Sequence, residues 1–374
     1  MGLTSDKVLV LAVVLALVLF LSTVWLWPRL AQQSWRAVSG RVVLLLGTQL
    51  TLFASVGLMV NQAFGFYASW ADLFGQENAQ GVVVDHIAGG ANSPIQVVAT
   101  SKVIGASSTL PQVAGQVQKV DIIGRTTHLA TPAFVYLPPE SFQPQNRTHK
   151  FPVSVVLTGY PGTAQALVDK LHYPSTALQL AKAGKMQPMI LVMLRPTVAP
   201  PRDTECVDVP GGPQTERFFA KDLRDAVMAR YRVDKTPASW GIVGDSTGGY
   251  CALKIAMHHP GSYAAAVGLS PYYKAPIDPT TGDLFHGDKN LQNRSDLFWT
   301  LKHLAAPETS LLVTSSRVGE HNYKDTLKFI KSVQATNVTR ISSIILPSGG
   351  HNFNTWRREI PPMLQWLSQR LVAH

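Results

Sequence analysis

A short glycine-rich segment in the second half of the chain has residue types and spacing suited to nucleophilic catalysis. Ser246 lies between Gly244 and Gly248 in a G-x-S-x-G pattern. An apolar run that predicts a strand precedes the pattern, and the helix-like run GYCALKIAMHH follows it. In a strand–serine–helix turn, a side chain at either glycine would clash with neighbouring backbone, and the serine is exposed at the edge of the sheet. The pattern therefore predicts that Ser246 is a nucleophile at a helix N-terminus rather than an idle serine in a turn.

A serine hydroxyl is a weak nucleophile until a base accepts its proton, and the chain has 11 histidines to choose from. Where this kind of turn is used, the order along the chain is nucleophile, acid, then histidine. His351 fits this order, because it lies on the glycine-rich loop PSGGHNF after the last predicted strand. We therefore predict that His351 is the base. The weaker candidates end the nucleophile helix, or lie in an insert, a surface helix or the acid loop: His258, His259, His286, His303 and His321.

The acid that orients the histidine should follow the preceding strand, where the sequence reads SLLVTSSRVGEHNYKDT. Glu320 lies in the loop a few residues past that strand, where a carboxylate can reach the imidazole. Asp325 falls at the start of the next predicted helix. We favour Glu320 and keep Asp325 as the alternative. The role of the acid is to hold the imidazole tautomer and to stabilise the imidazolium.

Two backbone N–H groups are needed to bind the oxyanion of an acyl intermediate. The N–H of Thr247, directly after the nucleophile, is one expected donor. The other should come from the loop Thr-Gly-Tyr-Pro-Gly at 158–162, where Tyr160 is the natural candidate. Pro161 cannot serve, because proline has no backbone N–H.

The elements that position these residues alternate between β-rich runs and amphipathic stretches from about residue 116. This alternation predicts an α/β domain over 116–374, with a mostly parallel central sheet flanked by helices. The predicted strands are 117–123, 132–136, 153–158, 189–194, 240–244, 264–268, 310–314 and 341–346. The predicted helices are 164–183, 214–231, 248–258, 323–335 and 356–372. Residues 71–115 have a weak pattern and are interpreted as a linker or an edge extension.

Residues 1–70 contain two long uncharged runs. Residues 8–27 form a run of about 30 Å as a helix, which matches the thickness of a bilayer core, and 42–62 form a second apolar run. We predict a membrane anchor of two transmembrane helices, about 8–27 and 42–62. The alternatives are a cleaved signal peptide for the first run and a buried core helix for the second.

The loop between the two apolar runs carries Arg29, Arg36 and Arg41 and no acidic residue. Basic loops tend to stay in the cytoplasm. Two crossings would then place the large C-terminal domain outside the cytoplasm. In that location a disulfide between Cys206 and Cys251 is chemically possible.

Composition excludes several classes of protein. The chain has 374 residues, of which 46% are hydrophobic and 15% charged, so it is not intrinsically disordered. Its net charge of +10 favours anionic surroundings such as lipid or wall polymer. The basic residues are dispersed and no groove-reading motif appears, so we expect no nucleic-acid partner. Two cysteines and the absence of an H-E-x-x-H motif give no metal site, and we expect no metal and no cofactor.

Longer segments of the domain resemble a known family. These segments are VYLPPES, LTGYPG, GDSTGGYCALKIAMHHPGSYAAAVGLSPYY and PSGGHNFNTWRREIPPMLQWL. Over roughly 130–374 the chain resembles the esterase D-like α/β-hydrolases, which include secreted actinobacterial esterases and the antigen 85 mycolyltransferases. The resemblance implies an α/β-hydrolase fold and a Ser–acid–His triad that acts on carboxylic esters or passes the acyl group to another alcohol. The usual His-Gly of the oxyanion loop is Thr158-Gly159 here.

Together these patterns predict a membrane-anchored serine esterase or acyltransferase with its catalytic domain outside the cell membrane. Its substrate would be an ester or an acyl lipid. The alternative is a non-catalytic hydrolase-fold protein that binds cell-wall polymer or a protein partner. Two further features stay open: the acidic loop 201–208 either lines the site entrance or is a surface loop, and Tyr272-Tyr273 either shape an acyl pocket or cover the core.

Overall fold

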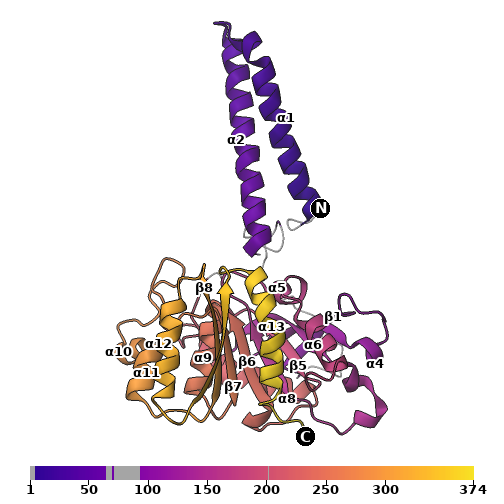
Figure 1. Cartoon of the computed structure of the whole chain (residues 1–374), viewed down its shortest axis with the longest axis vertical. Helices are drawn as coiled ribbons and strands as arrows, with labels where there is room; N and C mark the ends of the chain where they lie inside the picture. Colours follow the sequence, from indigo (N-terminus) through magenta and orange to yellow (C-terminus); the bar gives the residue numbers. More distant parts are fainter. Residues whose placement is uncertain (1–4, 65–69, 71–92, 201) are drawn as a thin grey trace. The chain divides into compact units, whose positions relative to one another are not determined.

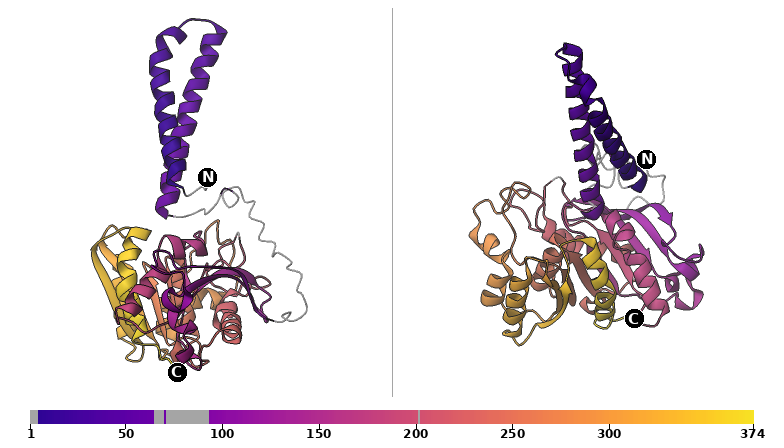
Figure 2. Two further views of the ribbon diagram at one scale, coloured as in Figure 1. Left: turned by 90° about the vertical axis from the view of Figure 1, so that its right-hand side faces the viewer. Right: turned by 45° about the horizontal axis from the view of Figure 1, so that its top comes forward.

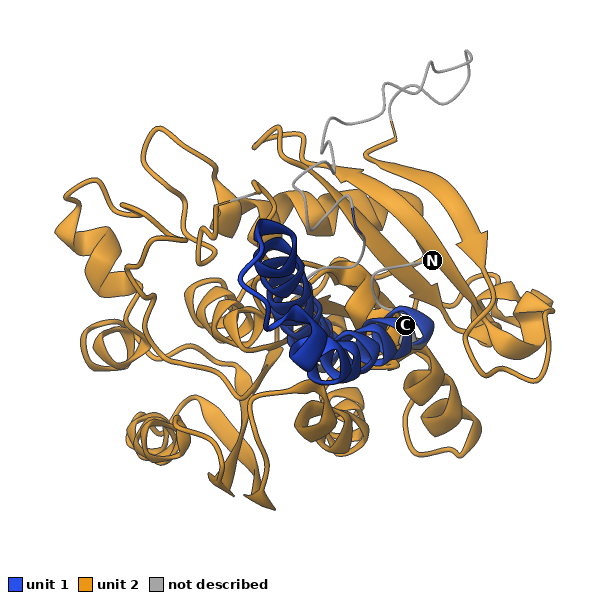
Figure 3. Cartoon of the chain, turned by 90° about the horizontal axis from the view of Figure 1, so that it is seen from above, with its two compact units in different colours: residues 1–78 blue, residues 79–374 orange. Residues whose placement is uncertain are grey.

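Figure 1 shows the chain as a computed structural model, which describes residues 5–64, 70, 93–200 and 202–374. The chain divides into two compact units, Met1–Asn78 and Ala79–His374, which Figure 3 distinguishes by colour.

The first unit is a pair of helices, α1 (Asp6–Leu30) and α2 (Trp35–Phe64). Within them, Lys7–Leu30 and Trp35–Gln62 are long and apolar enough to cross a membrane, judged by length and composition. The two helices pack against each other, and the hydroxyl oxygens of Thr23 and Thr48 lie 3.4 Å apart across their contact. Both helices extend beyond the predicted apolar runs 8–27 and 42–62, because flanking polar residues continue the helical backbone.

The second unit is built on a nine-stranded sheet in the order β1-β2-β3-β5-β4-β6-β7-β8-β9. Strands β5, β4, β6, β7, β8 and β9 pair in parallel, whereas β1, β2, β3 and β5 pair antiparallel at one edge. The predicted mostly parallel sheet is therefore confirmed. The strands are β1 (Ile95–Ser101), β2 (Gln116–Ile123), β3 (Ala130–Leu137), β4 (Val153–Leu157), β5 (Ile190–Leu194), β6 (Trp240–Asp245), β7 (Ala265–Leu269), β8 (Ser310–Val318) and β9 (Arg340–Ser348).

Helices cover both faces of this sheet, as Figures 1 and 2 show. One apolar layer packs α8 (Leu223–Arg230), α9 (Thr247–His258) and α12 (Tyr323–Gln334) against the sheet. The other packs α5 (Ala164–Asp169), α6 (Tyr173–Lys182) and α13 (Phe353–Ser368). The central strands are buried on both sides: in β4, Val155 belongs to the first layer and Val156 to the second.

Two predicted helices differ from the structure in a way that local sequence explains. The prediction of one helix over 164–183 is wrong, because the chain breaks between α5 and α6 at His172, which has a φ of 56°. Pro174 is the reason, since a proline fits the first turn of a helix but not its interior. The predicted helix 214–231 is instead a sequence of α7 (Thr215–Arg217), the π-helical turn η3 (Phe218–Asp222) and α8.

The interval 71–115, which we predicted to be a linker or an edge extension, contributes the edge strand β1. This strand was not among the predicted ones. Residues 71–92 of the interval lie outside the described residues.

The sheet also decides where a functional site can form. The parallel strands β4, β6, β7, β8 and β9 have their carboxyl ends at the same edge of the sheet. Loops that follow these strands therefore meet at one edge, which is where α/β folds commonly place a site.

Candidate active site

Ser246 lies in the sharp turn between β6 and α9, with φ 53° and ψ −122°. A non-glycine residue adopts such a backbone conformation only where the surrounding structure imposes it. The two flanking glycines allow the turn. A Cβ on Gly244 would lie 2.2 Å from the carbonyl carbon of Gly248, and a Cβ on Gly248 would lie 2.4 Å from the oxygen of Leu157. The strand–turn–helix context predicted from the sequence is thus present.

The structure brings His351 to Ser246. The loop after β9 places His351 Nε2 at 2.8 Å from Ser246 Oγ, which is hydrogen-bond distance. The imidazole also meets the ring of Trp356 edge to face, with centroids 5.2 Å apart. His351 as a whole residue is exposed, but desolvation of its ring lowers the pKa of His351 below the usual 6.5, and the charge of Glu320 partly offsets this by raising it. A neutral imidazole can accept the serine proton.

Glu320 lies in the loop between β8 and α12 and is buried. Its Oε2 accepts a hydrogen bond of 2.7 Å from the Ser316 N–H, and its Oε1 accepts one from the Ser270 hydroxyl. Within the described part of the chain, no hydrogen bond joins Glu320 to His351. The negative charge of Glu320 raises the pKa of His351 in this geometry.

Ser270 connects Glu320 to Trp356, whose ring packs on His351. Ser270 follows β7 with a φ of 46°, and its oxygen accepts a 2.9 Å hydrogen bond from Trp356 Nε1 while its hydroxyl donates to Glu320. Sequence analysis did not identify Ser270. The sequence signal for the contact between Ser270 and Trp356 was Trp356 itself, which lies five residues after His351 in the segment PSGGHNFNTW.

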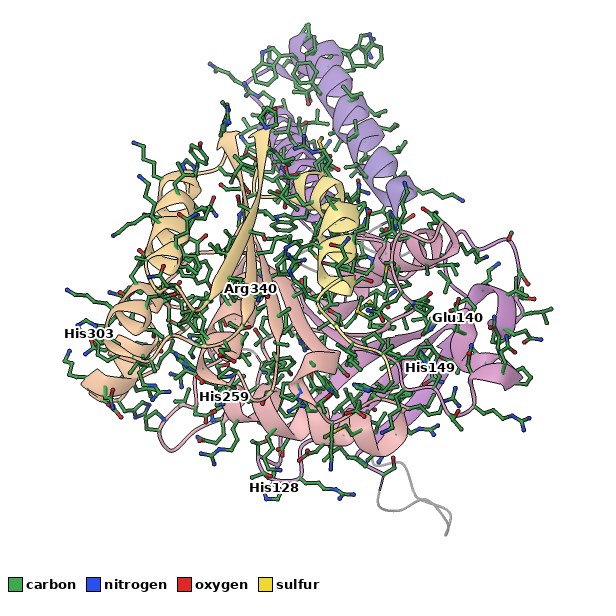
Figure 4. The ribbon with its side chains drawn as sticks, turned by 60° about the horizontal axis from the view of Figure 1, so that its bottom comes forward. His128, Glu140, His149, His259, His303 and Arg340 are labelled. Carbon is green, nitrogen blue, oxygen red and sulfur yellow. A yellow bond between two sulfur atoms is a disulfide. The ribbon has the colours of Figure 1, made fainter. Side chains whose placement is uncertain are left out.

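Asp325, the alternative acid, is exposed in the first turn of α12. Three of the other candidate histidines have hydrogen-bond partners away from Ser246. His258 Nδ1 and His259 Nε2 each lie 2.9 Å from Glu216 Oε1, and His303 Nδ1 lies 2.9 Å from the carbonyl oxygen of Trp299. Figure 4 shows His303 at the rim of the second unit.

The loop after β4 lies against the nucleophile. The N–H of Gly159 donates a 2.8 Å hydrogen bond to Asp245 Oδ2, and a Cβ on Gly159 would lie 2.9 Å from the Cβ of Ser246. Tyr160, the predicted oxyanion donor, directly follows Gly159 in the chain. On the other side, Thr247 is the first residue of α9, where N–H groups lack helical partners and the helix dipole favours negative charge.

Asp245 is a site residue that sequence analysis did not identify. It is buried, and burial raises its pKa from 3.8 to about 7 although the Gly159 N–H favours the charged form. Its Oδ1 has no hydrogen-bond partner among the described residues. An acid directly before the nucleophile, inside G-x-S-x-G, was the available signal.

Cys206 and Cys251 form a disulfide, with their Cα atoms 5.7 Å apart. The bond ties the loop after β5 to the nucleophile helix α9. No group of three or more potential metal ligands occurs among His, Cys, Asp and Glu in the part of the chain that the structure describes.

The comparisons with known proteins agree with this fold. A family model described as "Putative esterase" matches residues 125–367. An uncharacterized protein of Corynebacterium glutamicum is 24% identical over 252 residues, a match that covers 64% of this chain and 58% of the relative. The chain therefore spans little more than half the length of that relative.

Solved structures of an esterase and of two hydrolases have the same fold. A ferulic acid esterase superposes with a TM-score of 0.59 at 19% identity, covering 69% of this chain and 99% of its own. An S-formylglutathione hydrolase from Agrobacterium tumefaciens gives 0.58 at 16% identity, covering 74% and 99%. A fluorophosphonate-binding serine hydrolase of Staphylococcus aureus gives 0.55 at 16% identity, covering 68% and 98%. At these identities the likeness establishes the α/β-hydrolase fold.

Proposed function

Because the chain belongs to the esterase family whose model it matches over residues 125–367, we propose that it hydrolyses carboxylic esters with Ser246 as nucleophile and His351 as base. The observation that carries this proposal is the 2.8 Å distance between Ser246 Oγ and His351 Nε2 in the strained turn after β6. A serine without catalytic use would not need a base at hydrogen-bond distance.

In the proposed reaction, Ser246 Oγ attacks the acyl carbonyl carbon while its proton moves to His351 Nε2. The imidazolium then gives this proton to the leaving alcohol as the C–O bond breaks, which leaves an acyl-enzyme. Water attacks the acyl-enzyme in a second cycle of the same proton transfers. If a second alcohol attacks instead of water, the same site is an acyltransferase. Glu320 stabilises the imidazolium through its negative charge.

The N–H groups of Thr247 and Tyr160 are the proposed oxyanion donors. The bond from Gly159 N–H to Asp245 supports this assignment, because it uses the Gly159 donor and leaves the loop to present the next residue. The backbone N–H of Ser246 is also used, since it donates to the oxygen of Leu269. Thr247, in the first turn of α9, is the next donor along the chain.

We further propose that α1 and α2 anchor the protein in a membrane, with the catalytic unit outside the cytoplasm. Length and apolar composition of the two helices support the anchor, and the basic loop between them supports the orientation. The Cys206–Cys251 disulfide fits an oxidising location. Acyl lipids at the membrane surface are then a natural substrate class, and anionic lipid or wall polymer would suit the net charge of +10.

The first test is fluorophosphonate labelling of the full chain in detergent micelles, beside Ser246→Ala. The matched control is Ser262→Ala, whose hydroxyl donates to the oxygen of Ala220 on another part of the domain. We expect wild type and Ser262→Ala to be labelled and to cleave p-nitrophenyl butyrate, and Ser246→Ala to do neither. Equal labelling of Ser246→Ala would refute the assignment of the nucleophile. A folded wild type without labelling would favour a non-catalytic protein that binds wall polymer or a partner.

The orientation is tested separately with spheroplasts. A protease added outside should cut the catalytic unit in intact spheroplasts. Cleavage only after lysis would show that this unit lies in the cytoplasm.

A further inference from the structure

A buried acid, Glu205, lies beside the nucleophile helix without a role in the proposed reaction. Its side chain is 1% exposed, and both Glu205 and the next residue, Cys206, have positive φ values of 48° and 50°. Two consecutive non-glycine residues in this conformation cost free energy, so the surrounding structure must hold them there. The side chain that Glu205 contacts is Tyr272, whose hydroxyl lies 2.7 Å from Oε1 and 2.6 Å from Oε2.

Tyr272 connects Glu205 to the first turn of α9. It follows β7, and its ring stacks on Tyr250 with centroids 5.1 Å apart and an angle of 20° between the rings. The Tyr250 N–H donates a 3.0 Å hydrogen bond to the Ser246 carbonyl oxygen, so the stack lies one helical turn from the nucleophile. Tyr272 thus packs on the helical turn that begins with Thr247, whose N–H is a proposed oxyanion donor.

Three interactions hold the backbone of Glu205 against α9. The disulfide joins Cys206 to Cys251 in the second turn of that helix. The fully buried Lys254 donates from Nζ to the carbonyl oxygen of Cys206 at 2.7 Å and lies 3.5 Å from that of Glu205. Glu216 neutralises this lysine at 3.0 Å. A surface loop that only connects two elements would not need this set of interactions.

We propose that Glu205 is a positioning residue that acts through Tyr272: it fixes the Tyr272 ring against Tyr250 and thereby keeps the first turn of α9, with the Thr247 N–H, aligned with the oxyanion. This inference rests on the proposed function and adds two residues to its machinery. It also gives the acidic loop after β5 a task at the site.

The charge state of Glu205 is compatible with this role. Burial, and then the nearby charge of Asp203, raise the pKa of Glu205 to about 9, so the carboxyl is neutral at pH 7. A neutral carboxyl can accept the Tyr272 hydrogen bond without adding a negative charge near the oxyanion. Glutamine closely matches this neutral form in size and hydrogen bonding.

The test compares Tyr272→Phe, Glu205→Gln, Glu205→Leu and the double variant Glu205→Leu/Tyr272→Phe in the full chain. Phenylalanine keeps the stack on Tyr250 and removes only the hydroxyl. For Tyr272→Phe we expect kcat on p-nitrophenyl butyrate to fall about tenfold with little change in KM, less than the 10²–10³ that follows loss of an oxyanion donor itself. Binding of a trifluoromethyl ketone, which forms a tetrahedral adduct with the nucleophile, should weaken by the same factor.

The remaining variants separate positioning from packing. Glu205→Gln should restore most of the kcat that Glu205→Leu loses, and the double variant should be no slower than Tyr272→Phe alone. The matched control is Tyr273→Phe, whose hydroxyl meets Thr326 Oγ1 at 3.0 Å on another side of the core. We expect this control to lower thermal stability while leaving kcat and ketone binding unchanged.

Specific results would overturn the inference. Wild-type kcat and ketone binding in a folded Tyr272→Phe would show that the hydroxyl has no such role, even if Glu205→Leu does not fold. A double variant slower than Tyr272→Phe would show that Glu205 acts on another group. In both cases wild type still labels with fluorophosphonate and the proposed function stands. A folded wild type that neither labels nor cleaves esters would overturn both.

Discussion

Asp245 combines two properties that one substitution can separate. Its carboxylate accepts the Gly159 N–H at 2.8 Å, which holds the loop against Ser246, yet the side chain is buried and Oδ1 lacks a described partner. The substitution Asp245→Asn would keep an oxygen for Gly159 and carry no charge. We therefore expect this substitution to stabilise the protein at alkaline pH and to change activity little.

The size of the stabilisation follows from the pKa of Asp245, which burial raises from 3.8 to about 7. Below about pH 4 the carboxyl is protonated in both the folded and the unfolded chain, so its ionisation does not affect stability. Between about pH 4 and 7 the unfolded chain loses the proton first, and the free energy of unfolding falls as pH rises. Above about pH 7 the penalty is constant at roughly 4 kcal/mol, since a tenfold change in proton affinity corresponds to about 1.4 kcal/mol.

The assay compares the thermal unfolding temperature of the unit Ala79–His374 in wild type and in Asp245→Asn between pH 5 and 8. At about 2 °C per kcal/mol for a domain of this size, Asp245→Asn should unfold roughly 5–10 °C higher at pH 8 and only a few degrees higher at pH 5. Asp245→Ala, which removes the acceptor for Gly159, should lower kcat by up to about 10²–10³. A difference in unfolding temperature between Asp245→Asn and wild type that does not grow with pH would refute the reasoning.

Two other predictions concern the base and the turn. Wild-type kcat/KM should persist below pH 6.5, because desolvation lowers the pKa of His351 and the base acts in its neutral form. Glu320→Gln removes a charge that raises this pKa, so the acid limb of the pH profile should move to lower pH while kcat falls. Asp325→Asn is the control, and a shift of the acid limb in this variant would show that Asp325 is the acid. Gly248→Ala should give little folded enzyme, because its Cβ would lie 2.4 Å from the oxygen of Leu157. The control is Gly261→Ala, where a Cβ meets nothing within 4 Å, and it should have the unfolding temperature and activity of the wild type. A stable and active Gly248→Ala would contradict the geometry of the turn.

The sheet was largely predictable, because its central strands are short runs of β-branched and aliphatic residues between turns. All eight predicted strands are present, with ends within a few residues. The missing strand, β1, is an edge strand with only Ile95 buried, so burial imposes no alternation on its sequence. Pro174 indicated a helix start before α6, but the prediction followed the amphipathic pattern, which continues across 164–183.

The site residues were predictable only where they lie in a glycine-rich loop directly after a predicted strand. Ser246 and His351 follow strands in recognisable glycine-rich loops, and the structure brings them together. Contacts between residues far apart in sequence have no such local signal. Asp245 and Gly159 are 86 residues apart, and Glu320 and Ser270 are 50 apart. The pairing of Tyr272 with Glu205 is of the same kind, and only the folded sheet edge brings them into contact.

The order of strands along the chain also has a kinetic consequence during synthesis. Ser246 follows β6 and His351 follows β9, so the two residues that meet at 2.8 Å are 105 positions apart. At about 5–20 residues per second, the ribosome adds the histidine roughly 5–20 s after the serine. In the proposed mechanism the nascent protein therefore carries a nucleophile without its base for that interval. Ester cleavage can begin only once β9 has been made and docked, so activity reports completion of the chain rather than folding of its central sheet.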